Sequence, residues 1–304
     1  TYLDSLAESG ENLFQRNIVQ EIDEKTKEKL RMLMQQINID EYPKETIRKA
    51  FQLAVLKGMK EASQPHHALT PDAVCLFISY LVDKLVRKKS FVLLDPAIGT
   101  ANLVTAIQNQ IGRQVKCYGF EVDESLIRLS YVNANLQRNE LELFHEDSLK
   151  PFKLPPVDVV VSDLPFGYYP NKEVAKNYEL NEEKPLVHHL MIEQSLKRTT
   201  EGGILIFLVP NFLFAAPSAQ KLHQLIKKQA IILGLMQLPL SMFKAKQMAK
   251  SIFILQKKGK NVKPPRQALL VELPSFSRKE ALAEIVQRIE KWMKEELYID
   301  GQTS

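Results

Sequence analysis

The chain has 304 residues, of which 45% are hydrophobic and 25% charged, enough to bury one large core or a large core plus a small additional domain. Its two cysteines, Cys75 and Cys117, exclude a disulfide framework and a cysteine-rich metal cluster. The formal net charge of +5 only weakly indicates an anionic partner, so the placement of the charges has to be considered.

The amino-terminal stretch TYLDSLAESGENLFQ does not look like a targeting signal. It is acidic from its fourth residue and lacks the apolar segment of a signal peptide. The longest apolar run, ILIFLVPNFLFAA, is shorter than the about 20 residues that span a bilayer, and Pro210 interrupts it. We therefore expect a soluble, cytoplasmic protein with reduced cysteines and no membrane contact.

Residues 1–63 are expected to form a helical domain. The stretch NLFQRNIVQEIDEKTKEKLRMLMQQI, residues 12–37, repeats apolar residues at a spacing of three or four, as does PKETIRKAFQLAVLKGMK from Pro43. No segment of this region has the pattern of a strand. A small helical domain of this kind is suited to binding a partner or a substrate.

Residues 64–304 are expected to form an α/β domain. From Phe91 onward, short apolar strands alternate with amphipathic helices, which is typical of a parallel sheet covered on both faces. Two strands follow residue 240 without a helix between them, which predicts an antiparallel strand near the C-terminus. The fold is therefore Rossmann-like, with seven or slightly more strands. Strands are expected at 91–95, 115–121, 141–147, 157–163, 202–210, 231–239, 251–257 and 267–273, and helices at 101–110, 124–138, 186–199, 217–228 and 278–297.

Four successive predicted strands end in acidic or hydroxyl residues: Asp95, Glu121, Asp147 with Ser148, and Asp163. Ligands of an open parallel sheet bind beyond the carboxyl ends of its strands. Carboxylates gathered there repel one another unless a ligand supplies hydrogen-bond donors. Gly99 permits close backbone approach, and Glu121 follows it by 22 positions, a spacing suited to an acid that binds ribose hydroxyls.

The ligand that these acids favour is a cation that carries a nucleoside. The segment GTANLV lacks the later glycines of a dinucleotide-binding G-x-G-x-x-G, and Asp95 is a poor neighbour for phosphate. S-adenosylmethionine offers an ammonium and a sulfonium, a ribose for Glu121 and an adenine amine for Asp147, so we predict it as the cofactor. The pairs His66–His67 and His188–His189 do not have the spacing that chelates one ion, and no metal is expected.

In their order along the chain, these segments resemble the class I S-adenosylmethionine-dependent methyltransferases, in particular the adenine-specific DNA methyltransferases that modify exocyclic amines. DPAIGTA resembles the family's D-P-x-x-G-S-G, with Thr100 and Ala101 replacing the serine and the second glycine. Thr70 and Pro71 resemble its T-P segment, and LPLSMFKAKQMAKSIFILQKKG resembles its late P-x-x-x-F pattern. The resemblance covers roughly residues 64–275. It implies that the methyl donor contacts Thr70, Asp95, Pro96, Ala97, Gly99, Thr100, Ala101, Asn102, Glu121, Val122, Asp147, Ser148 and Asp163.

The segment DLPF, residues 163–166, resembles the family's catalytic motif D/N/S-P-P-Y/F. Asp163 and the carbonyl of Leu164 can each accept one hydrogen of a planar NH2 group, which enriches the nitrogen in electrons and aims its lone pair at the methyl group. Pro165 stiffens the loop, and Phe166 can stack on the target. Leu164 stands where the family has proline, so its backbone N–H needs a partner. The polar loop at 168–185 fits a lid, a target-contacting segment or a long connection.

Three functions stay open. The first is an N-methyltransferase acting on adenine in DNA or, second in preference, RNA, since residues 243–266 contain eight Lys or Arg and no acid. Sequence specificity would then need the N-terminal helices or a partner subunit. The second is methylation of a protein glutamine amide, although Asp163 stands where such enzymes have Asn. The third is a non-catalytic module that binds cofactor and nucleic acid, which Leu164 and Ala101 favour.

Overall fold

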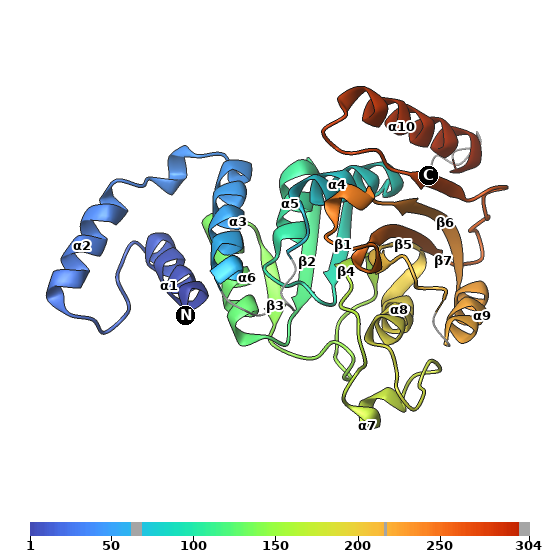
Figure 1. Ribbon diagram of the computed structural model, residues 1–304, viewed down its shortest axis with the longest axis horizontal. Helices are drawn as coiled ribbons and strands as arrows, with labels where there is room; N and C mark the ends of the chain where they lie inside the picture. Colours follow the sequence, from blue (N-terminus) through green and yellow to red (C-terminus); the bar gives the residue numbers. More distant parts are fainter. Residues whose placement is uncertain (62–68, 216–217, 298–304) are drawn as a thin grey trace. The chain divides into compact units, whose positions relative to one another are not determined.

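The computed structural model describes residues 1–61, 69–215 and 218–297. The chain divides into two compact units, Thr1–Ser148 and Leu149–Ser304, called unit 1 and unit 2 below. It contains a mixed eight-stranded sheet, in the order β3-β2-β1 within unit 1 and β4-β5-β7-β6-β8 within unit 2 (Figure 1). The predicted Rossmann-like fold is thereby confirmed. The expected domain boundary at 63 and 64 and the pair His66–His67 lie outside the described residues, so the division into domains stays a prediction.

Unit 1 begins with helices, as the periodicity predicts, and the stretch 12–37 is divided between two of them. Helix α1 (Tyr2–Gln15) ends where Arg16 takes a left-handed conformation, with φ at 54°. The side chain of Asn12 then accepts the N–H of Val19 at 3.1 Å and holds the chain in a turn. The elements that follow are α2 (Glu24–Gln35), a 3-10 turn (Ile39–Glu41) and α3 (Lys44–Glu61).

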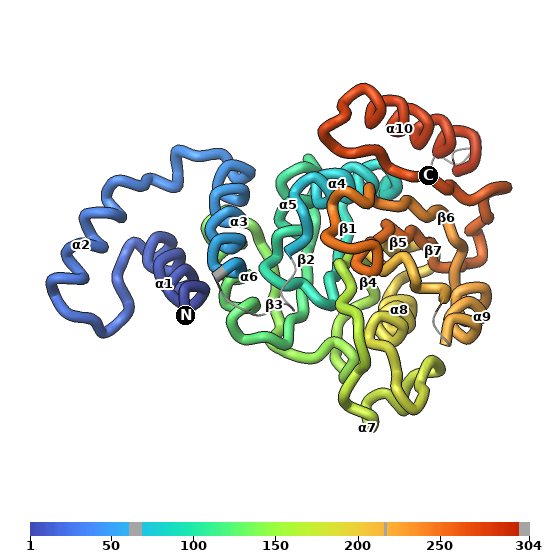
Figure 2. Tube along the Cα trace, in the orientation of Figure 1, coloured from blue at the N-terminus to red at the C-terminus, as the bar shows by residue number. Residues whose placement is uncertain are grey.

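Helices α1 and α3 share a core with α6 (Glu124–Leu136). A Cβ added at Gly10 would lie 2.2 Å from Cγ1 of Val132, so α1 approaches α6 this closely because residue 10 has no side chain. Helix α2 contains no buried residue, and the tube in Figure 2 shows it apart from the strands of unit 1. The buried apolar residues of the shared core are Leu3, Ala7, Phe51, Val55, Leu126, Leu129, Val132 and Leu136.

The three strands of unit 1 are parallel and end at one edge. Asp95 lies opposite Gly119, and Phe120 lies opposite Phe144, so the segments that follow each strand leave the sheet side by side. This edge carries three of the predicted acids, Asp95, Glu121 and Asp147. The remaining elements of unit 1 are α4 (Asp72–Leu85), β1 (Ser90–Asp95), α5 (Asn102–Gln110), β2 (Gln114–Phe120) and β3 (Leu141–Phe144).

Unit 2 holds the predicted antiparallel strand, β7, which pairs antiparallel with both β5 and β6. Strand β4 is parallel to β5, and β8 is parallel to β6. Its major elements are β4 (Val157–Asp163), α7 (Lys172–Ala175), α8 (Val187–Arg198), β5 (Thr199–Pro210), α9 (Ala219–Gln229), β6 (Ala230–Gln237), β7 (Lys250–Lys257), β8 (Leu269–Glu272) and α10 (Lys279–Trp292). Short helical turns occupy Leu240–Met242, Lys246–Met248 and Met293–Leu297.

The direction of β7 divides the basic stretch 243–266. Lys250, the first residue of β7, pairs with Pro210 at the end of β5, and Ser251 pairs with Gln237 at the end of β6. The ends of β4, β5 and β6 and the start of β7 therefore share one edge, called the carboxyl edge of unit 2 below. The residues after Lys257 lie at the opposite edge, about 25 Å away for eight strand residues. Only the first part of the basic stretch can serve a site at the carboxyl edge.

Candidate functional site

The loop between β1 and α5 is the first part of the candidate donor site. Asp95 is buried at its start, and its carboxylate accepts the N–H of Ala97 at 3.0 Å. Gly99 and Ala101 both lie in the left-handed region, with φ at 59° and 60°. A Cβ at Gly99 would meet no atom within 4 Å, so the space beside this residue is open. Ala101 holds a conformation that costs an L-residue about 1–2 kcal/mol, where the resembling family has glycine.

Glu121, directly after β2, holds this loop through its carboxylate. Oε2 accepts the N–H of Gly99 at 2.9 Å, and Oε1 accepts the N–H groups of Val122 and Asp123 at 2.8 and 3.0 Å. An ionised carboxylate has about four acceptor positions, so these three bonds leave room for a hydroxyl donor. The side chain of Val122 is 65% exposed beside the acid and offers an apolar surface to a flat ring.

Two residues of α6 fix the same loop, and the sequence pattern had not indicated them. Ser130 donates to the carbonyl of Gly99, and Asn133 donates to the carbonyl of Thr100 at 2.8 Å. Both lie on the buried face of α6. A buried polar residue three positions from another on an otherwise apolar helix face is the signal that could have found them.

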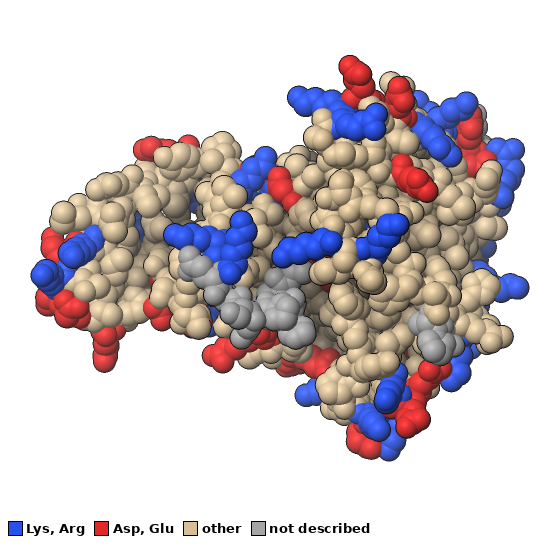
Figure 3. Space-filling view, in the orientation of Figure 1, with Lys and Arg blue, Asp and Glu red and all other residues tan. Residues whose placement is uncertain are grey.

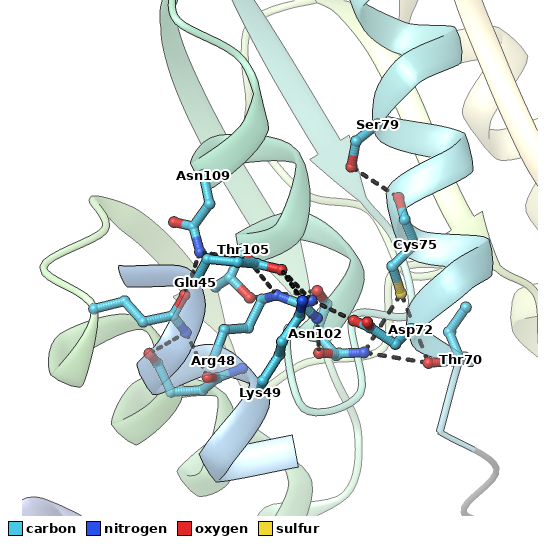
Figure 4. Close-up of polar contacts among 12 residues, drawn as sticks. Glu45, Arg48, Lys49, Thr70, Asp72, Cys75, Ser79, Asn102, Thr105 and Asn109 are labelled. Carbon is cyan, nitrogen blue, oxygen red and sulfur yellow. Dashed lines mark hydrogen bonds and ion pairs between the residues drawn. The ribbon is translucent and has the colours of Figure 1, made fainter. Parts of the chain in front are cut away.

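Next to the donor loop, helix α3 contributes a buried arginine to an ionic network (Figure 4). Arg48 of α3 is fully buried. Its guanidinium donates to both carboxylate oxygens of Glu45 at 2.7 and 2.8 Å, to the amide oxygen of Asn102 at 2.7 Å and to Asp72. Asn102 in turn donates to the carbonyl of Thr70 at 3.2 Å. One arginine thus joins α3, the first residue of α4 and the first residue of α5.

Two residues that were predicted to contact the methyl donor, Asn102 and Thr70, belong to this network. The side chain of Asn102 is engaged by Arg48 and by the carbonyl of Thr70, and it is buried, so its contacts position the start of α5. An open pocket lies beside Thr70, lined by Leu69–Asp72 and by Lys49, Gln52, Leu53 and Leu56 of α3. Helix α3 therefore lies beside the segment expected to hold the methionine end of the donor.

In unit 2, the predicted catalytic motif lies at the carboxyl edge, directly after β4. Leu164 is buried, and its N–H donates to the carbonyl of Leu208 at 3.2 Å. Proline has no N–H, so the N–H that Leu164 adds at this position needs a hydrogen-bond partner, and the carbonyl of Leu208 is that partner. Pro165 and Phe166 are exposed. Gly167, with φ at 129°, turns the chain away, and its carbonyl accepts the N–H of Val187 at 3.0 Å.

Lys250 lies beside this motif, which the sequence pattern did not indicate. Its ammonium donates to the carboxylate of Asp163, and both side chains are mostly buried. The same ammonium lies 5.8 Å from the centre of the Phe166 ring. A cation therefore contacts the two groups that a target amine and a target ring are expected to use.

The loop that follows the motif, residues 168–185, is held by hydrogen bonds at several points. The N–H of Tyr169 donates to the carbonyl of Pro185 at 2.8 Å, and the hydroxyl of Tyr178 donates to the carbonyl of Leu149 at 2.6 Å. The buried carboxylate of Glu193 in α8 accepts the N–H groups of residues 179 and 180, both at 2.9 Å, and pairs with Lys197 at 2.7 Å. These bonds fix the middle of the loop from inside the unit.

The pair His188–His189 in α8 is buried, with the ring centres 4.7 Å apart. Burial lowers the pKa of His188 to about 4, so this imidazole is neutral at pH 7. Nδ1 of His189 lies 3.1 Å from the hydroxyl of Ser218. In the described part of the chain, no three His, Cys, Asp or Glu residues gather as a metal site would require, and no helix is long and apolar enough to cross a membrane.

Two successive parts of the chain match two family models. Residues 1–59 match the YtxK N-terminal helical domain, and residues 57–298 match the family N-6 DNA Methylase. The uncharacterized protein YtxK of Bacillus subtilis (strain 168) is 46% identical over 303 residues, which cover 97% of this chain and 92% of that protein.

Solved structures agree with this assignment. A candidate class I S-adenosylmethionine-dependent methyltransferase from Listeria monocytogenes has a TM-score of 0.91 at 43% identity, over 97% of this chain and 92% of that chain. The modification subunit of a candidate type I restriction enzyme from Vibrio vulnificus YJ016 has a TM-score of 0.70 at 17% identity, over 96% and 66%, and shares the fold. The predicted resemblance is confirmed, and the chain belongs to the N-6 DNA Methylase family.

Proposed function

We propose that this protein is an S-adenosylmethionine-dependent N-methyltransferase that modifies the exocyclic amine of adenine in nucleic acid, with DNA preferred over RNA. The observation that carries the proposal is the end of β4, where the carboxylate of Asp163 is followed by the exposed ring of Phe166. Membership of the N-6 DNA Methylase family supports the same activity.

The residues of unit 1 fit the methyl donor. S-adenosylmethionine would supply an electrophilic methyl group on a sulfonium. Asp95 provides a buried negative charge for the cationic end, and Glu121 keeps acceptor capacity for ribose hydroxyls beside the open space at Gly99. Val122 offers an apolar surface, and Asp147 follows β3 at the same edge. Thr70 and its neighbours would form the remaining wall, since Asn102, held by Arg48, donates to the carbonyl of Thr70.

The residues of unit 2 would prepare the acceptor. Asp163 and the carbonyl of Leu164 accept the two hydrogens of the target amine, and Phe166 stacks on the base, which holds the nitrogen lone pair toward the donor. Lys250 has to release Asp163 before the amine can bind. The activity requires the donor residues of unit 1 and this motif to face a common space during turnover.

The proposal also covers partners and organisation. The relatives that share the fold include modification subunits of type I restriction systems, which supports a DNA acceptor and a separate partner subunit that confers sequence specificity. We propose the division into a helical domain at 1–63 and a methyltransferase domain at 64–304 on the basis of the two family matches, which meet at residues 57–59.

A second candidate is a module that binds the donor and nucleic acid without turnover. The ion pair between Lys250 and Asp163 favours it, because a cation beside the acceptor nitrogen opposes the positive charge that develops there during methyl transfer. Leu164 and Ala101, which replace a proline and a glycine of the family motifs, also favour the non-catalytic candidate.

The test is transfer from methyl-labelled S-adenosylmethionine to DNA, RNA or total protein by the full chain and by Asp163→Ala. The proposal predicts label in N6-methyladenine with the full chain and none with Asp163→Ala, while both bind the donor. Donor binding without any labelled product would contradict the methyltransferase and support the non-catalytic candidate. If label appears only in glutamine of the protein fraction, the acceptor is a protein amide and not adenine.

A further inference from the structure

The exposed apolar side chains of unit 2 are concentrated at its carboxyl edge. Seven large apolar residues are exposed in the described part of this unit, and six of them follow β4, β5 or β6 or precede β7. The seventh, Leu270, lies within β8. The six, called the apolar rim below, are Phe166, Tyr168, Phe212, Phe214, Leu240 and Met248, and their exposed fractions run from 41 to 68%.

Four of the six rim residues are aromatic, and they lie next to one another in the sheet order. Phe166 and Tyr168 follow β4, while Phe212 and Phe214 follow β5, which is hydrogen-bonded to β4. The ring of Phe214 is anchored edge-on against Phe253 of β7, 5.6 Å between centres. Exposed aromatic rings offer flat faces to a planar ligand.

Several lysines lie beside the rim. Lys184 lies 6.0 Å from the centre of the Tyr168 ring, and the segment between β6 and β7 carries Lys244 and Lys246 without an acid. The neighbouring loop carries four acids: Glu173, Glu179 and Glu182 are paired with Lys176, Lys228 and Lys221, and Glu183 is exposed. Figure 3 shows cationic and anionic side chains interspersed over the face that it draws, so charge alone marks no nucleic-acid track there. At the carboxyl edge, lysines accompany the exposed aromatic rings of the apolar rim.

We propose that the apolar rim and these lysines bind an unpaired stretch of nucleic acid strand. The faces of its bases stack on Phe212, Phe214 and Tyr168, and its phosphates lie along Lys184, Lys244 and Lys246. In a duplex the base faces are covered by their neighbours, so exposed aromatic rings gain contact area only from unpaired or extruded bases. That this strand presents the amine to Asp163 rests on the proposed function, whereas the binding itself does not.

The test measures binding of the full-length protein to fluorescein-labelled single-stranded DNA of mixed sequence by anisotropy, beside the same sequence as a duplex and vesicles of phosphatidylserine. Phe212→Leu and Tyr168→Leu keep an apolar side chain and remove the flat face. Each is expected to weaken single-strand binding about tenfold. In the double variant Lys244→Gln, Lys246→Gln, the slope of log affinity against log salt concentration is expected to become shallower by about one or two units, because one or two phosphate contacts are lost. Leu270→Ala is the control and is expected to leave binding unchanged.

Single-strand binding that is tighter than duplex binding and falls with each ring substitution would support the inference. Equal affinity for the duplex, affinity that survives both ring substitutions, or binding to vesicles in place of oligonucleotides would overturn it. Binding of labelled S-adenosylmethionine is scored separately in the same samples. A protein that binds the donor and methylates duplex DNA without dependence on Phe212 would overturn this inference alone. A protein that binds the strand and no donor would overturn the proposed function alone.

Discussion

Replacement of Arg48 by methionine tests whether the N-terminal helices are part of the donor site. Methionine has a similar length and no charge, so Arg48→Met removes the guanidinium while keeping most of the packing volume. The change leaves Glu45 and Asp72 without their shared partner and removes the donor to the amide oxygen of Asn102. Figure 4 shows these groups converging from three segments of unit 1.

The expected loss of stability follows from burial. Breaking a buried ion pair by removing one partner costs about 3–5 kcal/mol, because the remaining charge loses its compensation. The side chains of Glu45 and Asp72 are 25 and 34% exposed, so water can partly replace the guanidinium. The lower end of that range, about 3 kcal/mol, is therefore expected. Asn102 is also released from its position at the start of α5, so affinity for S-adenosylmethionine should fall by about tenfold as well.

Urea unfolding at pH 7 measures the first effect, and equilibrium dialysis with labelled S-adenosylmethionine measures the second. Lys49→Met is the matched control, because Lys49 is the next residue, is half-exposed and lies 3.8 Å from the same Glu45. It should change stability by less than about 0.5 kcal/mol. Val55→Ala, in the shared core, controls for a general loss of stability without contact to Asn102. An Arg48→Met protein as stable as Lys49→Met, or one that binds the donor as Val55→Ala does, would refute the reasoning.

Three further predictions test other parts of the structure. Lys250→Met should raise the rate of methyl transfer about tenfold in single-turnover assays, because the target amine no longer competes with an ammonium for Asp163; Lys260→Met, at the opposite edge, should change nothing, and a slower Lys250→Met enzyme contradicts the competition. The free energy of unfolding should fall by up to about 3 kcal/mol as the pH falls from 6.5 to about 4, since burial lowers the pKa of His188 to about 4 and the unfolded chain binds the proton first. Urea titrations across this range measure the loss, which His188→Leu should reduce, and an identical slope in that variant would assign the loss to other groups. Gly10→Ala should destabilise the protein by about 1–3 kcal/mol in thermal unfolding, because its Cβ would lie 2.2 Å from Val132; Gly112→Ala, where a Cβ meets nothing within 4 Å, is the control, and equal melting temperatures would show that α1 does not pack on α6 as described.

The α/β part of the fold was predictable because its strands are short, β-branched and bounded by turn residues. The strand expected at 157–163 is β4 with the same ends, and the antiparallel β7 follows from two strands without a helix between them. The break between α1 and α2 was not predictable from periodicity, because Ile18, Val19 and Ile22 continue the helical spacing. A side-chain bond from Asn12 and a left-handed Arg16 end the helix instead.

The candidate site was predictable where it depends on strand ends and not where it depends on tertiary contacts. Asp95 and Glu121 come together because parallel strands end at one edge. Arg48 gave no signal, since an arginine in a helical pattern is usually solvated and its partner Asn102 lies 54 residues away. Lys250 was one of eight cations in a basic stretch, and only the antiparallel direction of β7 selects it as the one beside Asp163. The donor contacts themselves stay predictions.

The central claim is that unit 1 binds a methyl donor. Equilibrium dialysis of the full-length protein against methyl-labelled S-adenosylmethionine, with Glu121→Gln in parallel, measures this binding directly. The structure predicts one donor molecule per chain, and an affinity reduced at least about tenfold when Glu121 loses its charge, because the amide is a weaker acceptor for ribose hydroxyls and for the N–H of Gly99. Folded wild-type protein that retains no label, or label retained equally by Glu121→Gln, would contradict the assignment of a methyl donor to this edge of the sheet.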